Sequence, residues 1–173
     1  MDALIDIEIP AEIRELEVKR QGDYYDEVCD ELGVQNLSAL EGKEWHDAHA
    51  RVRENEYAGR CQERHQIRPF CYRRGYSDCE PFEVVRIVSE NCVEVRALDA
   101  KQDPEWVKQM EWHAGGFAGH LANQRAQKWI FARNENNEVF KIRWHKARGC
   151  WGLGRYGEYR MCDEPYKFYD YNF

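Results

Sequence analysis

Charge and aromatic residues are distributed unevenly along this chain, and the composition changes near Arg68-Pro69. Residues 1–66 carry 17 acidic and 8 basic side chains, a net charge of −9, with four aromatic residues. Residues 67–173 carry 15 acidic and 17 basic side chains, a net charge of +2, with nineteen aromatic residues. Such a shift favours two structural units, an acidic one over 1–66 and an aromatic-rich one over 67–173.

The acidic unit contains helix signals. Pro10, followed by acidic residues, predicts the start of a helix, and Gly22 predicts its interruption. A second helix is expected over residues 23–32, with Gly33 as its C-terminal stop.

A further helix is indicated by a capping box. Ser38 and Glu41 have the spacing at which a hydroxyl and a carboxylate bind the unpaired amides of a helix start. Trp45, Ala48 and Val52 then recur on one apolar stripe, and the helix is expected to end between residues 57 and 66.

The sequence of the second unit predicts β-strands. Residues 82–98 and 128–144 are alternating runs around turn sequences, which predicts two antiparallel hairpins in one sheet. Four side chains are expected to be largely buried in it: Val85, Val93, Ile130 and Ile142. A weaker pair surrounds the turn at 152–157. The predicted fold class is α+β, a short acidic helical unit followed by a small antiparallel β-sheet or an SH3-like barrel.

The connection over residues 99–127 is long for a compact domain, and such insertions are often functional. It contains a glycine-rich segment in which glycines permit close approach of a ligand and polar side chains can orient or protonate it. The candidate binding residues there are His113, Gly115, Gly116, His120, Asn123 and Gln124. Either this loop is structural, or it is the centre of a small enzyme.

A metal site can be drawn from Cys61, His65, Cys71 and Cys79, because thiolate and imidazole are good zinc ligands. Their spacing lacks the tight Cys-x-x-Cys pair of usual zinc modules, so neither a metal nor another cofactor is predicted. The N-terminus lacks the features of a secretory leader, and no run of about 18 apolar residues occurs. A cytoplasmic protein with reduced thiols is expected.

Several segments of the second unit resemble a known family. These are PFEVVRIVSENCVEVRALDAKQD, GGFAGHLANQRAQKW, EVFKIRW and the closing KFYDYNF. Together they resemble an uncharacterised family of small proteins from phages and other mobile elements, over about residues 81–173. The family has no established activity. The resemblance implies a setting in the bacterial host cytoplasm, where small phage proteins often bind and block a host system.

The function expected from these observations is that of a non-enzymatic binding protein that modulates or inhibits a host or defence protein, with counter-defence such as anti-CRISPR activity included. The contact with a basic partner surface is assigned to five acidic residues: Asp23, Asp26, Glu27, Asp30 and Glu31. These carboxylates repel nucleic acid, or compete for the basic surface of a protein that binds it. Alternatively, they only solvate a surface helix. A single-stranded nucleic-acid-binding barrel remains the rival reading, because the second unit is mildly basic and aromatic.

The C-terminus is expected to be docked, because five of the last eight residues are aromatic. A free tail of this composition would expose an apolar patch that soluble monomers avoid.

Overall fold

The computed structural model describes residues 21–115 and 119–172. Of these, residues 21–66 fall in one compact unit and residues 67–172 in another. The helix expected to start at Pro10 lies outside the described residues.

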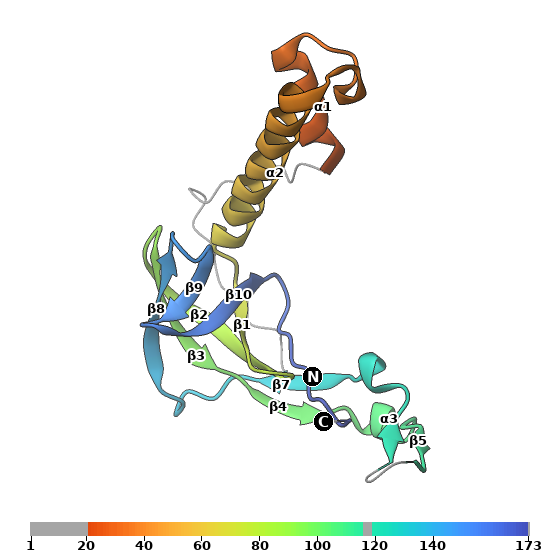
Figure 1. The fold of residues 1–173 in the computed structure, drawn as a ribbon. Helices are drawn as coiled ribbons and strands as arrows, with labels where there is room; N and C mark the ends of the chain where they lie inside the picture. Colours follow the sequence, from red (N-terminus) through yellow and green to blue (C-terminus); the bar gives the residue numbers. More distant parts are fainter. Residues whose placement is uncertain (1–20, 116–118, 173) are drawn as a thin grey trace. The chain divides into compact units, whose positions relative to one another are not determined.

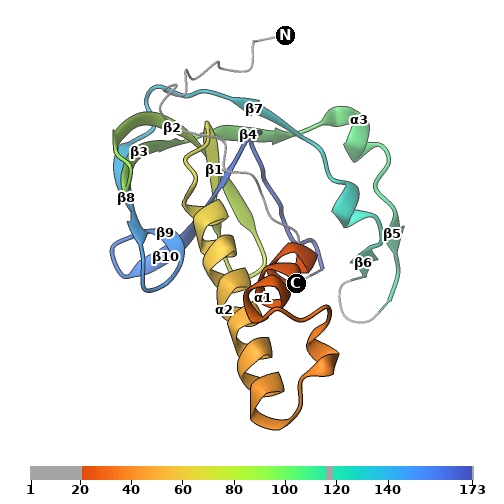
Figure 2. The ribbon, with the colours of Figure 1, turned by 90° about the horizontal axis from the view of Figure 1, so that it is seen from above.

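The first unit is a pair of helices, α1 (Gln21–Leu32) and α2 (Gly42–His65), joined through a short 3₁₀ helix, η1 (Leu37–Ala39) (Figure 2). Its core is formed by four buried residues, Val28, Cys29, Leu37 and Ala48, with Val52 among those packed against them. The helix expected over 23–32 is therefore confirmed, as is the packing of Ala48 and Val52. Trp45, expected on the same stripe, is instead 39% exposed.

Gly33 ends α1 as predicted. It has a φ of 65°, and the amide of Val34 donates to the carbonyl of Cys29 at 3.0 Å. This is the Schellman arrangement, which requires a left-handed residue that glycine adopts without strain. Gly22, expected to interrupt a helix, lies instead inside the first turn of α1.

The prediction of a capping box at Ser38 and Glu41 was wrong. Helix α2 begins at Gly42, its N-cap is Glu41 without a side-chain hydrogen bond, and Ser38 lies in η1. The Tyr25 hydroxyl donates to the side chain of Asn36 at 2.7 Å and accepts from the Leu37 amide at 2.9 Å. These tertiary contacts fix a 3₁₀ turn where the local pattern indicated the start of the long helix.

Among the described residues, six strands of the second unit form a closed antiparallel barrel in the order β1-β10-β9-β8-β3-β2 (Figure 1). They are β1 (Phe70–Arg74), β2 (Cys79–Ser89), β3 (Cys92–Ala97), β8 (Val139–His145), β9 (Cys150–Leu153) and β10 (Tyr156–Cys162). The interior is filled by large side chains, among them Phe82, Ile142, Trp151 and Tyr159. The expected α+β class with a small barrel is confirmed.

The hairpin predicted over 82–98 is confirmed as β2 and β3, and the pair around 152–157 as β9 and β10. The hairpin predicted over 128–144 was wrong. Strand β7 (Trp129–Ala132) pairs with β4 (Asp99–Gln102), whereas β8 pairs with β3 and β9. The side-chain amide of Asn137 donates to the carbonyl of Ala97 at 3.0 Å. The residues between β7 and β8 are thus hydrogen-bonded to the end of β3 rather than forming the turn of a hairpin.

Two of the four expected core residues are exposed. Val93 and Ile142 are fully buried, but Val85 is 41% exposed and Ile130 is 54% exposed. The β2–β3 register shifts between Val84 and Arg86, so Val85 is the extra residue of a bulge and leaves the inward alternation. Ile130 lies outside the barrel, in the two-stranded β4–β7 sheet.

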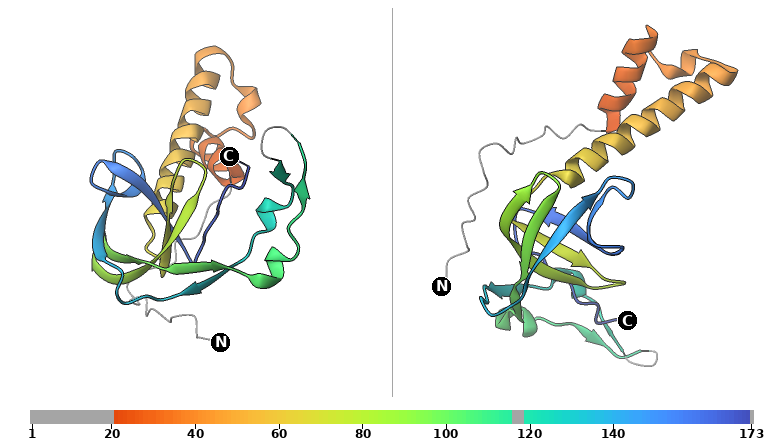
Figure 3. Two further views of the ribbon diagram at one scale, coloured as in Figure 1. Left: turned by 90° about the horizontal axis from the view of Figure 1, so that it is seen from below. Right: turned by 90° about the vertical axis from the view of Figure 1, so that its left-hand side faces the viewer.

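The β4–β7 ribbon leads into the insertion, which contains α3 (Pro104–Val107), β5 (Trp112–His113), β6 (His120–Leu121) and η2 (Gln124–Ala126). The C-terminal segment runs beside it (Figure 3). The amide of Tyr169 donates to the side chain of Gln127 at 2.8 Å, and the Tyr171 ring lies near both Trp106 and Trp112. The prediction of a docked C-terminus is confirmed over residues 168–172.

None of the described helices combines the length and apolarity needed to cross a bilayer.

Candidate functional site

The five predicted acidic residues recur every three or four positions along α1, so they lie on one face of the helix. We call Asp23, Asp26, Glu27, Asp30 and Glu31 the acidic stripe. The opposite face is buried, because Tyr24, Val28 and Cys29 are each less than 9% exposed. Four of the five acids are exposed and Glu27 is half-buried. Packing against α2 therefore directs these carboxylates away from the core of the helical unit.

One end of the acidic stripe is paired within the unit. Glu31 forms a salt bridge with the guanidinium of Arg51 on α2, and both side chains are about half exposed. Exposed pairs of this kind contribute little to stability, because water and salt screen them. The pair does fix the position of the Glu31 carboxylate.

The charge of the helical unit is concentrated in its first half. Residues 21–48 carry eight acids and one base, a net charge of −7, whereas residues 49–66 carry three acids and four bases, a net charge of +1. With a helical rise of 1.5 Å per residue, the acidic stripe places one carboxylate about every 3 Å along the axis. One strand of duplex DNA places a phosphate about every 3.4 Å along its axis. The two linear charge densities are similar.

A pocket of about 340 Å³ lies beside the acidic stripe, within the helical unit. It is lined by Leu32, Leu40, Glu44, Asp47, Ala48 and Arg51. We call it the helical pocket. Sequence reasoning missed all six residues, because the pocket depends on the η1 turn, which the capping-box prediction replaced with helix. Leu32 and Leu40, on either side of that turn, are the apolar signal that could have indicated it.

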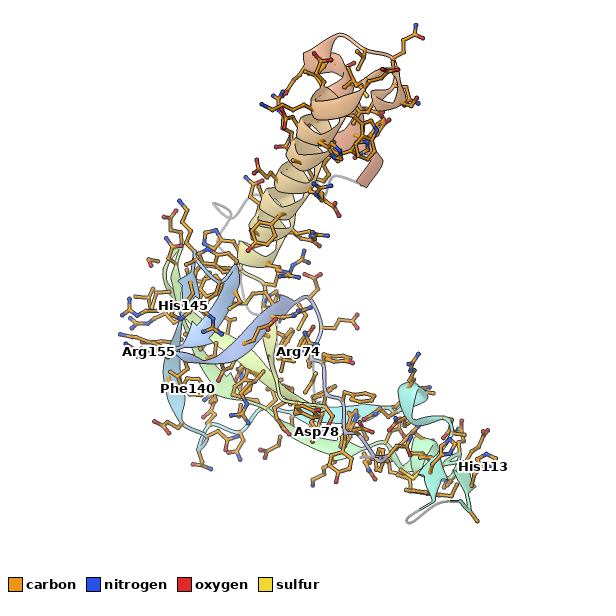
Figure 4. All side chains as sticks on the ribbon, in the orientation of Figure 1. Arg74, Asp78, His113, Phe140, His145 and Arg155 are labelled. Atoms are coloured by element: carbon orange, nitrogen blue, oxygen red, sulfur yellow. The ribbon has the colours of Figure 1, made fainter. Side chains whose placement is uncertain are left out.

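The glycine-rich loop is a strand pair at the tip of the insertion. His113 pairs with His120 between β5 and β6, and the centroids of their rings are 5.8 Å apart. Both residues are exposed. Figure 4 shows His113 at the outer end of the insertion, far from barrel residues such as Phe140. A Cβ at Gly115 would meet nothing within 4 Å, and Gly116 lies outside the described residues.

The other two predicted loop residues bind the backbone of the chain itself. Asn123 accepts from the Glu111 amide at 3.1 Å and donates to the Gln109 carbonyl at 2.6 Å. Gln124 accepts from the Tyr171 amide at 3.0 Å through its side-chain oxygen. Their polar groups therefore close the insertion and hold the C-terminal segment, so the structure does not assemble these residues with His113 and His120 into one polar cluster.

Of the four residues considered for zinc, Cys61 and His65 lie on α2 in the helical unit, whereas Cys71 and Cys79 lie on β1 and β2 in the other unit. Over the described part of the chain, no group of three or more His, Cys, Asp or Glu side chains could hold a metal ion. Cys71 lies in the apolar barrel core, where burial, with a smaller contribution from Cys162, raises the pKa of its thiol well above the usual range. The thiolate that a metal requires is disfavoured there.

Comparison of the chain with protein-family models, with curated proteins and with solved structures found no match.

Proposed function

We propose that this chain is a non-enzymatic binding protein whose acidic stripe contacts a basic surface of a partner protein and so modulates or inhibits that partner. The observation that carries the proposal is the division of α1 into a buried face and a face of five carboxylates. Four of these acids are exposed, so a partner can reach their carboxylates from outside the unit. Their position suits a contact made outward.

Electrostatic complementarity supports this function on physical grounds. A field of one sign raises the association rate with a surface of the opposite sign and disfavours wrong partners. Because the acidic stripe approaches the axial charge spacing of one DNA strand, proteins with a basic groove for nucleic acid are the best-matched partners. The resemblance to phage and mobile-element proteins adds the setting, in which the partner is a host or defence protein.

The enzymatic alternative has less support. Of its polar candidates, Asn123 and Gln124 are engaged with backbone groups of the insertion. His113 and His120 lie on a short exposed ladder. Imidazoles exposed to solvent lack the water-excluding surroundings in which proton transfer and charge stabilisation are effective.

The nucleic-acid alternative is also weaker. Phe82, Trp151 and Tyr159 point into the filled barrel and are at most 5% exposed, so they offer no stacking surface. The whole chain carries a net charge of −7, which opposes attraction to phosphate.

The test begins with capture of partners from a bacterial host lysate on the immobilised chain. The captured protein is then purified and titrated with a variant in which the five acids of the acidic stripe are changed to Lys. We expect its affinity to fall by at least about tenfold, with a smaller loss at high salt because salt screens the contact.

The matched control changes five exposed acids elsewhere to Lys, so that the net charge shifts equally. These are Glu54, Glu63, Glu135, Glu138 and Glu164. The control variant should retain most of the affinity. Full affinity in the stripe variant, or an equal loss in both variants, would contradict the proposal.

A further inference from the structure

We infer that the helical pocket receives an aliphatic side chain from a basic amphipathic segment of the partner, a helix that presents leucine-like residues flanked by Lys or Arg. This inference rests on the proposed function. It adds an apolar anchor to a contact that charge alone would leave unspecific.

The apolar part of the helical pocket comes from the junction of the two helices. Ala48 is buried at 2% exposure, Leu40 is half-buried against the core, and Leu32 is 40% exposed at the end of α1. A large aliphatic side chain left this accessible beside a concave surface costs free energy in water, and covering it is favourable.

The rim of the helical pocket is unevenly charged. The guanidinium of Arg51 is held by Glu31. Glu44 and Asp47 are exposed and form no ion pair with another residue in the described part of the chain. Two carboxylates therefore remain at the rim for cationic groups of an occupant, in a region whose net charge is already −7.

The size of the helical pocket limits its occupant. Its volume is about 340 Å³. It is close to the lower end, about 300 Å³, of pockets that hold small molecules. One or two aliphatic side chains fit such a space, as in recognition of an amphipathic helix by a groove.

Charge selects among the occupants of this shape. An acidic segment would be repelled by Glu44, Asp47 and the acidic stripe. A purely apolar segment would cover the two carboxylates without pairing them, which is unfavourable. A segment with both apolar and basic side chains covers the apolar lining of the helical pocket and also pairs with the carboxylates at its rim.

The probe is a labelled helical peptide of about 14 residues, about four turns, with Leu on one face and Lys elsewhere. Binding to the full chain is measured by fluorescence anisotropy. One control peptide replaces each Leu with Gln and keeps every Lys, and a second keeps each Leu and replaces Lys with Glu. We expect the Leu–Lys peptide to bind at least about tenfold more tightly than either control.

Two variants of the chain test the location. Leu32→Ser removes an exposed wall of the helical pocket, and Asp47→Lys reverses the charge at its rim. Each should weaken the Leu–Lys peptide by at least about fivefold. The matched controls are Leu153→Ser, at a residue 49% exposed on β9, and Glu63→Lys, at an exposed residue of α2. Neither control should change the affinity by more than about twofold.

The outcomes separate this inference from the function on which it rests. The control peptide with Gln in place of Leu could bind as tightly as the Leu–Lys peptide, and both could lose affinity only when the acidic stripe is changed to Lys. That result would leave the proposed function standing and would show that the helical pocket is not an anchor. So would the absence of any binding by the Leu–Lys peptide. If Leu32→Ser instead changed a dimer into a monomer in sedimentation, a second copy would cover the helical pocket and the inference would be wrong.

Discussion

Glu83 is a fully buried carboxylate on the outer face of β2. It accepts from the guanidinium of Arg96 at 2.7 Å and from that of Arg133 at 2.8 Å. Arg96 lies on β3, and Arg133 follows β7, so the carboxylate joins the barrel to the ribbon that leaves it. A buried charge of this kind is tolerated only because both guanidinium groups replace its lost hydration.

Replacement of this carboxylate by an amide should be costly. Glu83→Gln leaves two guanidinium groups beside a neutral side chain, and loss of one partner from a buried ion pair typically costs about 3–5 kcal/mol. We expect the free energy of unfolding in urea to fall by an amount in that range. Glu94→Gln, which breaks an exposed pair with Arg86, is the control and should cause a far smaller change. Equal effects would show that Glu83 is not a structural ion-pair centre.

Cys162 makes stability depend on alkaline pH. Burial raises the pKa of its thiol from 9.0 to about 12, with Asp163 adding to the shift and Arg68 opposing it. Below pH 9 the thiol is protonated in both the folded and the unfolded chain. Above pH 9 the unfolded chain loses this proton first, so stability is lost as pH rises toward 12.

The corresponding experiment compares the chain with Cys162→Ala. Each proton contributes a slope of up to about 1.4 kcal/mol per pH unit. Between about pH 8 and about pH 10, the free energy of unfolding should therefore fall by roughly 1 kcal/mol more in the unchanged protein than in Cys162→Ala. Parallel pH profiles of the two proteins would contradict the raised pKa.

At the scale of elements, Gly59 of α2 lies directly against the ring of Tyr24 on α1. A Cβ at this position would lie 1.8 Å from the hydroxyl oxygen of Tyr24 and 2.7 Å from the ring carbon that bears it. Glycine in the middle of α2 costs helical stability relative to alanine, about 1 kcal/mol. Close packing of the Tyr24 ring requires it nonetheless.

A double-mutant cycle tests that reason. Gly59→Ala should lower the melting temperature of the helical signal in far-UV circular dichroism, because the buried Tyr24 ring must move. In the background of Tyr24→Ala the same change should raise stability by about 1 kcal/mol, since only the helix propensity then remains. An effect of one sign in both backgrounds would show that the ring does not impose the glycine.

The C-terminal segment is held by hydrogen bonds and by aromatic contacts. The amides of Tyr169 and Tyr171 donate to the side chains of Gln127 and Gln124, and the side chain of Asn172 forms two bonds with the backbone of Leu121. Deletion of residues 167–173 should therefore lower the melting temperature by several degrees, at about 4–8 °C per kcal/mol for a small domain.

A point change refines the deletion. Gln127→Ala removes both the acceptor of the Tyr169 amide and a donor to the Tyr169 carbonyl, so it should destabilise the protein in the same direction. Gln109→Ala, at an exposed side chain, is the control and should leave the melting temperature unchanged. An unchanged melt of the truncated chain would contradict docking.

The sequence predicted the positions of strands more reliably than it predicted which strands pair with each other. Alternation placed Val93 and Ile142 in the core because both belong to regular barrel strands. It failed for Val85 at a bulge and for Ile130 in the outer ribbon. Local periodicity reports a strand's two faces, whereas pairing is decided by contacts such as that of Asn137 with Ala97, which are 40 positions apart.

The candidate site divides in the same way. The acidic stripe follows from spacing along a single helix, so its shared face could be predicted. The structural role of Gln124 could not, because its partner Tyr171 lies 47 positions away. The helical pocket required the η1 turn, which is fixed by Tyr25 from the preceding helix.

At the scale of the whole molecule, net charge governs which polymers the protein meets. With a net charge of −7, the chain should not retard duplex DNA in a gel at about 0.15 M salt. Changing the five acids of the acidic stripe to Lys brings the net charge from −7 to +3 and should produce weak, salt-sensitive retardation. Retardation by the unchanged protein would instead favour the nucleic-acid-binding alternative.

Closure of the barrel joins its first strand to its last. Phe70 of β1 pairs with Cys162 of β10, and Arg74 pairs with Glu158. Joining two points about 90 residues apart costs about 4 kcal/mol of chain entropy beyond a constant. A ribosome adding about 5–20 residues per second needs several seconds to supply the intervening residues. Throughout that interval the edge of β1 that later pairs with β10 has unpaired backbone groups, which can form hydrogen bonds with strands of other chains. The period of greatest aggregation risk during synthesis is therefore set by the order of the strands.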